Sequence, residues 1–302
     1  MTVLLNVVLP VFLVVLVSAL AQTRLRLDAR TLSRIAFYVF SPALVFDALT
    51  TSDISGGELG QITIVFLAMT AIMWLVGEGA TRLLRLPSPT AAAFLVCILM
   101  MNAGNYGVPV NLFAFGEPGL ARASIYFTLS AILAATVGVY LSARGRTSAS
   151  LALRRVVQVP LVYAALLGLA FNLGNWAVPE PLAKAIQLLG QASVPIMLVV
   201  LGLRLAQVLQ SRQRPAHLPA LGIATVLRLL VAPAVAWVLA GVVGLSGLAR
   251  DVTVLESAMP TAVMATILAT EFESDPSFAA LAVLVTTLLS LPTLTILLNL
   301  LP

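Results

Sequence analysis

Apolar stretches long enough to cross a lipid bilayer recur along the whole chain. A membrane-spanning helix needs about 17–25 residues, and lipid offers no partners to free backbone groups, so each stretch is expected to be helical. The chain is 60% hydrophobic and only 10% charged, whereas soluble domains carry about 45–50% apolar and about 25% charged residues. The sequence therefore predicts an all-α integral membrane protein with ten transmembrane helices. They lie near residues 2–21, 32–50, 59–80, 89–112, 120–143, 156–174, 181–205, 218–243, 250–271 and 277–300.

The basic residues between these stretches predict how the chain is oriented. Of the seventeen Lys and Arg residues, thirteen fall in alternate connections, which are expected in the cytoplasm, and only Arg122, Lys184 and Arg250 fall in the remaining, outer connections. Cytoplasmic connections carry the excess of Lys and Arg, so both termini are expected outside, with the protein in the cell (inner) membrane. Topology thus accounts for the net charge of +5, and no nucleic-acid partner is expected. The thirteen are Arg24, Arg26, Arg30, Arg34, Arg82, Arg85, Arg144, Arg146, Arg154, Arg155, Arg204, Arg212 and Arg214.

The chain divides into two halves around a short basic linker. Residues 1–143 and 156–302 each hold five of the apolar stretches, and residues 144–155 form the longest polar break between them. An odd number of spans in each half forces the halves into opposite orientations. The predicted fold is therefore two five-helix repeats, the second inverted with respect to the first.

Weak internal similarity supports this repeat. At an offset of 158 residues, Met101 falls on Met259 and Asn102 falls on Pro260. These residues lie in the fourth and ninth stretches, each of which is followed by an acid–proline pair and another apolar helix. Inverted repeats with broken helices at corresponding positions are typical of secondary transporters.

Helix-breaking residues and amides coincide in the fourth stretch. Gly104, Gly107 and Pro109 each weaken a helix, and Asn102 and Asn105 lie among them. An unwound backbone at membrane depth is tolerated where it lines a protein-enclosed cavity. We expect Asn102, Asn105 and the backbone at Pro109 to bind a substrate. The alternative is a structural kink whose asparagines bond neighbouring helices.

A second break is predicted in the ninth stretch. Pro260 removes one backbone hydrogen bond and clashes with the preceding turn, and Thr261 places a hydroxyl just beyond it. Crossed half-helices from the two repeats would bring Asn102 and Pro260 together near the membrane midplane. Ser257 before this break and Asn111 after the first are secondary candidates for the substrate site.

Both breaks resemble segments of the auxin efflux carrier family. Asn102, Gly107 and Pro109 resemble the break in that family's fourth helix. The last two stretches resemble its last two helices in Met-Pro-Thr-Ala at 259–262, Ala-Thr-Glu-Phe at 269–272, Asp-Pro at 275–276 and Leu-Pro at 291–292.

The resemblance covers the whole chain and implies a fold and a function. It implies crossing fourth and ninth helices, a scaffold domain, a transport domain, elevator-type alternating access and a homodimer. It also implies that Asn102 contacts a substrate carboxylate and that Pro109 and Pro260 are the crossover prolines. The short linker is similar to that of the bacterial members, which include permeases for malonate and other small organic anions. The expected substrate is a small organic anion, malonate-like or auxin-like.

Two charged residues fall within predicted spans. Glu256 lies one turn before Pro260; intramembrane acids usually face a cavity and mark an ion or proton path, but Glu256 is also close to the outer interface. Arg228 lies some way into the eighth stretch. It either attracts an anionic substrate or extends its charged head to the cytoplasmic surface.

The sequence lacks the residues that other functional classes require. The single Cys97 and the single His217 exclude a multi-cysteine or histidine-based metal centre, and no hydrolase or metalloprotease motif is present. No enzyme activity and no cofactor are therefore expected. A channel or a membrane sensor built on the same broken-helix fold remains the alternative, since broken helices also form pores.

Overall fold

The computed structural model describes residues 4–143, 154–210 and 217–301. Within these ranges every regular element is a helix, and two backbone segments pair in an isolated β-bridge. Seven of the described helices are long and apolar enough to cross a membrane. The part of the chain that the structure describes is thus helical, as expected of an integral membrane protein. Most of the predicted linker, residues 144–153, lies outside the described residues.

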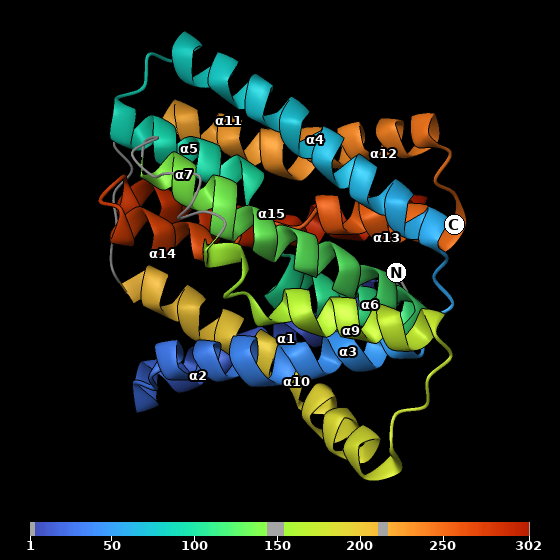
Figure 1. Cartoon of the computed structure of the whole chain (residues 1–302). Coiled ribbons are helices and arrows are strands. Elements are labelled where there is room, and N and C mark those ends of the chain that lie inside the picture. The colour runs from blue at the N-terminus through green and yellow to red at the C-terminus, as the bar shows by residue number, and fades with distance from the viewer. Residues whose placement is uncertain (1–3, 144–153, 211–216, 302) are drawn as a thin grey trace.

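A first group of helices comes from the N-terminal segment and the middle of the chain. It consists of the π-helical turns η1 (Leu4–Val8) and η2 (Ala36–Phe40) and of α1 (Leu9–Leu25), α2 (Ala29–Ile35), α3 (Ser41–Thr50), α9 (Pro160–Leu173) and α10 (Glu180–Gln210). α10 packs against both α1 and α3, and α3 packs against α9. Figure 1 shows α1, α2, α3 and α10 together along one side of the molecule.

The remaining helices form a second group. It consists of α4 (Gly56–Leu83), α5 (Ser88–Leu99), η3 (Ala103–Gly107), α6 (Val108–Leu133), η4 (Ala134–Gly138), α7 (Val139–Ser142), α11 (Leu218–Val226), η5 (Leu227–Val231), α12 (Ala232–Val243), α13 (Gly247–Ser257), α14 (Met264–Glu271) and α15 (Pro276–Leu300). α13 packs against α6 and α12, and α15 packs against α5 and α14. In Figure 1, α4, α11 and α12 lie on the side opposite α1 and α10.

Side-chain caps set the start of two long helices of the second group. The Ser55 side chain accepts a hydrogen bond from the Glu58 N–H at 3.1 Å and begins α4. Asp275 accepts from the Phe278 N–H at 3.0 Å and begins α15. Each such cap stabilises a helix by about 1 kcal/mol. Asp275 also accepts a hydrogen bond from the Thr90 hydroxyl at 2.8 Å, which ties the start of α5 to α15.

The predicted apolar stretches correspond to described helices with two kinds of departure. The fourth and ninth stretches are each divided, into α5 and η3–α6 and into α13 and α14. The boundary expected between residues 112 and 120 is not a loop. It is a kink within α6 at Gly116, whose φ of 66° and ψ of −158° interrupt the helix, a conformation that glycine adopts without a steric penalty.

Arg122 lies in a helix and not in a loop, and its partners stand at the connection between α3 and α4. We expected Arg122 in an outer connection, but it lies inside α6 with only 7% of its side chain exposed. It pairs with Glu58 at 2.6 Å and with Asp53 at 3.1 Å. Arg122 therefore joins α6 to the start of α4.

Candidate functional site

The two helix breaks meet and pair through their backbones. The Asn102 N–H donates to the Pro260 carbonyl at 2.8 Å, and the Ala262 N–H donates to the Met100 carbonyl at 2.8 Å. Between these bonds, Met101 and Thr261 form an antiparallel bridge. The predicted proximity of Asn102 and Pro260 is therefore confirmed. We call these paired segments, residues 100–102 and 260–262, the crossover.

The local sequence explains why the chain unwinds at the first break and then resumes as a helix. The Asn102 carbonyl accepts from the Gly107 N–H at 2.9 Å, which closes the wide turn η3. Pro109 stands in the first turn of α6, where its missing N–H leaves no bond unmade. At Gly104, a Cβ would lie 2.7 Å from an atom of the Phe127 ring, so only glycine fits this backbone beside α6.

Thr261 is held inside the crossover. Its hydroxyl donates to the Cys97 carbonyl at 3.0 Å, and its N–H donates to the Thr286 hydroxyl at 3.1 Å. The first bond satisfies a carbonyl in the last turn of α5, which has no partner within the helix. Thr261 thus fastens the second break to α5 and α15.

Arg228 is buried between the ends of the two interrupted helices. Its guanidinium donates to the Ile98 carbonyl at 2.8 Å and to the Ser257 carbonyl. These carbonyls belong to the last turns of α5 and α13, where a positive charge is favoured by the helix dipoles. The surface-reaching interpretation of Arg228 is wrong, because its side chain is wholly buried.

Glu256 is also wholly buried and contacts the first break. Its Oε1 accepts from Asn111 Nδ2 at 2.9 Å, and the same amide nitrogen donates to the Gly107 carbonyl at 2.9 Å. Gly107 lies directly against the carboxyl group, because a Cβ there would collide with it. Beside Glu256, the Ser257 and Tyr126 hydroxyls lie 2.7 Å apart.

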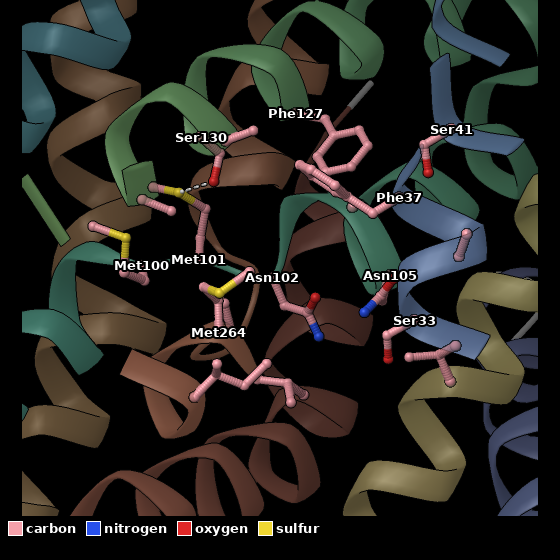
Figure 2. A pocket seen from close by; sticks show the side chains of 18 of the residues that line it. Ser33, Phe37, Ser41, Met100, Met101, Asn102, Asn105, Phe127, Ser130 and Met264 are labelled. Carbon is pink, nitrogen blue, oxygen red and sulfur yellow. Dashed lines mark hydrogen bonds between the residues drawn. The ribbon is translucent and has the colours of Figure 1, made fainter. Parts of the chain in front are cut away.

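A cavity of about 150 Å³ lies beside the crossover, between the first and second groups of helices. Asn102 and Asn105 line it from the second group, and Ser33, Phe37 and Ser41 face them from the first group (Figure 2). Asn102 Nδ2 is buried and has no hydrogen-bond partner among the described residues. A buried, unused amide donor on a cavity wall is suited to binding a ligand acceptor.

A wider space of about 800 Å³ adjoins this cavity. The two spaces share several lining residues, Ser33, Phe37 and Arg204 among them. Arg30 and Arg34 also line the wider space, which we call the vestibule. Three arginines therefore line the vestibule next to the cavity.

Most of the predicted site residues lie around the cavity rather than on its wall. Asn102 and Asn105 line it. Those not among the described lining residues are Pro109, Asn111, Arg228, Glu256, Ser257, Pro260 and Thr261.

Sequence analysis missed Arg204, which it assigned to a cytoplasmic connection. Arg204 lies in α10, and its Nη2 donates to the Ser33 hydroxyl at 3.3 Å. The apolar residues that follow it, Leu205, Ala206, Val208 and Leu209, indicate that the helix continues beyond the arginine. This apolar pattern could have predicted that Arg204 lies within a helix and not in a connection.

Comparison with known proteins identifies the family of the chain. The membrane transport protein family matches residues 3–150 and 141–298 of the chain. An uncharacterized transporter of Methanothermobacter thermautotrophicus is 33% identical over 270 residues, which cover 88% of this chain and 87% of that protein. An uncharacterized transporter of Methanocaldococcus jannaschii is 28% identical over 278 residues, with 87% and 86% covered.

Plant proteins match over a shorter region. Auxin efflux carrier component 1 of Arabidopsis thaliana is 28% identical over 146 residues, which are 46% of this chain and 23% of that protein. The family match itself extends over nearly the whole chain. The chain therefore belongs to the membrane transport protein family, the family of the auxin efflux carriers, and is a multi-pass membrane transporter.

Proposed function

We propose that the chain is a secondary transporter of a small organic anion and that the cavity beside Asn102 and Asn105 is its substrate site. The observation that carries this proposal is the unused Asn102 amide donor. It stands at the crossover of two interrupted helices and faces a cavity that leads to a vestibule bearing three arginines. Discontinuous helices of this kind form the binding sites of many secondary transporters.

Two helix N-termini favour a negatively charged substrate. η3 and α6 resume directly after Asn102, and α14 begins at Met264, which lines the cavity. A helix N-terminus presents free N–H groups and the positive end of the helix dipole. An anion bound between the two N-termini would accept hydrogen bonds from the backbone and from the Asn102 amide.

The vestibule would raise the local concentration of anions. Arg30 and Arg34 are exposed and Arg204 is half-buried. Their positive charges can therefore attract anions that enter the vestibule. The Glu271 carboxylate, on the same wall, pairs with Arg155 at 3.4 Å. A recess lined by one sign of charge concentrates ions of the opposite sign.

The position of the cavity suits alternating access by an elevator-type movement. One wall comes from the first group of helices and the other from the second group, which holds the crossover. Sliding of the second group along the first would carry the site across the membrane. In this proposal the ten spans form two inverted repeats, residues 1–143 and 156–302, and two copies associate as a homodimer.

The conformation described is open to the cytoplasm in this proposal. Arg30 and Arg34 belong to a connection that the positive-inside pattern places in the cytoplasm, and both line the vestibule. Both chain termini would then lie outside the cell membrane.

Uptake into proteoliposomes tests the proposal. The purified protein is reconstituted and supplied with radiolabelled malonate, other short dicarboxylates and indole-3-acetate in turn. We expect saturable uptake of at least one carboxylate, lost in Asn102→Ala and kept in the control Asn299→Ala, because Asn299 is exposed at the end of α15. Uptake unaffected by Asn102→Ala would place the substrate elsewhere. Absence of carboxylate uptake would overturn the anion assignment, and conductance far above carrier turnover would favour a channel.

A further inference from the structure

Two buried oxygen atoms of the Glu256–Asn111 pair have no hydrogen donor. Both side chains are wholly buried, and Asn111 Nδ2 donates to Glu256 Oε1. Within the described residues, Glu256 Oε2 and Asn111 Oδ1 have no hydrogen-bond partner. The orientation of the amide is fixed, because its nitrogen also donates to the Gly107 carbonyl, which can only accept. Each side chain of the pair therefore has one satisfied atom and one unsatisfied oxygen.

An ionised Glu256 would be costly in this position. A buried carboxylate that has a single neutral donor and no cation loses its hydration without adequate compensation. No ion pair joins Glu256 to a basic side chain among the described residues. One added proton removes both deficits, since a protonated Oε2 becomes a donor and Asn111 Oδ1 is an acceptor without a donor.

We propose that Glu256 carries a proton in this conformation and exchanges it with water during the transport cycle, which makes transport proton-linked. The inference rests on the proposed transport function. The step is a simple dissociation: the Glu256 O–H bond breaks, the electron pair stays on the carboxylate, and the proton passes to water. It takes place when the crossover moves to a state in which water reaches the carboxyl group.

The contacts of Glu256 explain how its proton could affect the substrate site. The carboxyl lies against Gly107, whose N–H donates to the Asn102 carbonyl and whose carbonyl accepts from Asn111. The Asn102 carbonyl is thus hydrogen-bonded to the same short turn that contacts Glu256. A charge appearing on the carboxylate would break the reciprocal pair with Asn111 and disturb this turn.

The other charged and titratable groups around α13 have partners of their own or lie at the helix ends. Arg228 of η5 is bonded to two carbonyls, and Tyr126 of α6 contacts the Ser257 hydroxyl. The Tyr106 hydroxyl of η3 accepts from Ser290 at 3.1 Å. The rest are Glu58, Glu78 and Arg82 of α4, Glu117 and Arg122 of α6, Asp275 at the start of α15, and Arg250 and Asp251 of α13 itself. Glu256 differs from these groups, because one added proton would complete its hydrogen bonding with Asn111.

Infrared spectroscopy tests the proton without any substrate. The wild-type protein at neutral pH should show the C=O stretching band of a protonated carboxylic acid. The band should vanish in Glu256→Gln and persist in the control Glu271→Gln, because Glu271 is exposed. The Gln side chain reproduces the neutral acid, since its amide can donate to Asn111 Oδ1, so this variant should fold. A wild-type spectrum without the band, or a band unchanged in Glu256→Gln, would overturn the proposal.

Transport in proteoliposomes then tests the linkage, using whichever carboxylate of the uptake panel the wild type moves. A pH gradient should drive accumulation by the wild type, whereas Glu256→Gln should lose accumulation and keep exchange of labelled for unlabelled substrate. Accumulation that depends on a sodium gradient and not on pH would overturn the proton assignment. Failure of every carboxylate in the wild type would count against the transport proposal, while the infrared result would still decide whether Glu256 holds a proton.

Discussion

The Asn102 N–H donates a hydrogen bond of 2.8 Å to the Pro260 carbonyl, and so joins two helix breaks that lie far apart in the sequence. The Asn102 carbonyl is also occupied, by the Gly107 N–H. Both backbone groups of Asn102 are thus committed, while its side-chain Nδ2 has no partner among the described residues. The crossover fixes the position of this amide and leaves its buried donor without a hydrogen bond beside the cavity.

Replacement of Asn102 by alanine should weaken substrate binding while the fold is retained. The backbone bonds of residue 102 persist in the variant, and only the side-chain amide is lost. A hydrogen bond to a charged group contributes about 1.5–3 kcal/mol, so affinity should fall about tenfold to a hundredfold. The measurement is the thermal stabilisation of the purified protein by the transported carboxylate, which depends on ligand concentration relative to the dissociation constant. Equal stabilisation of variant and wild type would contradict this role.

The helix breaks could be predicted from the sequence, but most of the contacts around them could not. Gly104, Pro109 and Pro260 weaken helices through backbone chemistry, which is local and visible in the sequence. The direction of the Thr261 hydroxyl depends on which helix end packs beside it. Here the hydroxyl donates a hydrogen bond to the Cys97 carbonyl at the end of α5. Such a pairing joins residues that are distant in the chain, so a single sequence does not reveal it.

Arg204 shows a second limit of sequence reasoning. A basic residue near the end of an apolar stretch is read as a topological signal, and this interpretation says nothing about the direction of its side chain. In the structure, Arg204 contacts Ser33 of α2 and lines both the cavity and the vestibule. Its relevance to the site comes from the packing of α10 beside α2, which neither helix encodes alone.

Replacement of Arg204 by glutamine should reduce the affinity for an anionic substrate. The change removes the positive charge at the boundary between cavity and vestibule and keeps a polar, though shorter, side chain. We expect the KM for the carboxylate to rise about tenfold, the scale of one charge-assisted hydrogen bond, and uptake to become less sensitive to added salt. The matched control is Arg82→Gln, because the Arg82 side chain is 83% exposed. A similar KM in both variants would show that Arg204 does not meet the substrate.

Replacement of Gly104 by alanine should distort the cavity wall. The added Cβ would meet the Phe127 ring, and overpacking of this kind typically costs about 1–3 kcal/mol. We expect a lower apparent melting temperature and reduced uptake. Gly79→Ala should not lower the melting temperature, since nothing lies within 4 Å of a Cβ at that position and alanine favours the helix more than glycine does.

A second substitution identifies the cause of the Gly104 effect. Phe127→Leu removes the ring that the new methyl group would meet, so it should recover part of the stability lost in Gly104→Ala. A double-mutant cycle of melting temperatures and unfolding free energies measures this coupling. Strictly additive effects would show that the loss at position 104 comes from somewhere other than the ring.

Replacement of Arg228 by methionine should destabilise the crossover more than any other substitution considered. The variant keeps an apolar stem of similar length but leaves the Ile98 and Ser257 carbonyls without the donors that now bond them. Each unsatisfied buried group costs about 1–3 kcal/mol, so the expected loss for the two carbonyls is about 2–6 kcal/mol of unfolding free energy. Arg228→Lys should recover only part of it, because one ammonium group does not reproduce the two arms of a guanidinium.

The control for Arg228 is Arg250→Met. Arg250 stacks on the Trp237 ring at 3.8 Å from its centre, a contact worth about 0.5–1 kcal/mol at an accessible site. Both variants remove one arginine from the same half of the chain, so they differ mainly in the carbonyls left without donors. Unfolding in detergent, followed by circular dichroism, should show a clearly larger loss for Arg228→Met. If the two variants unfold alike, then the carbonyls at the ends of α5 and α13 do not depend on Arg228 for their stability.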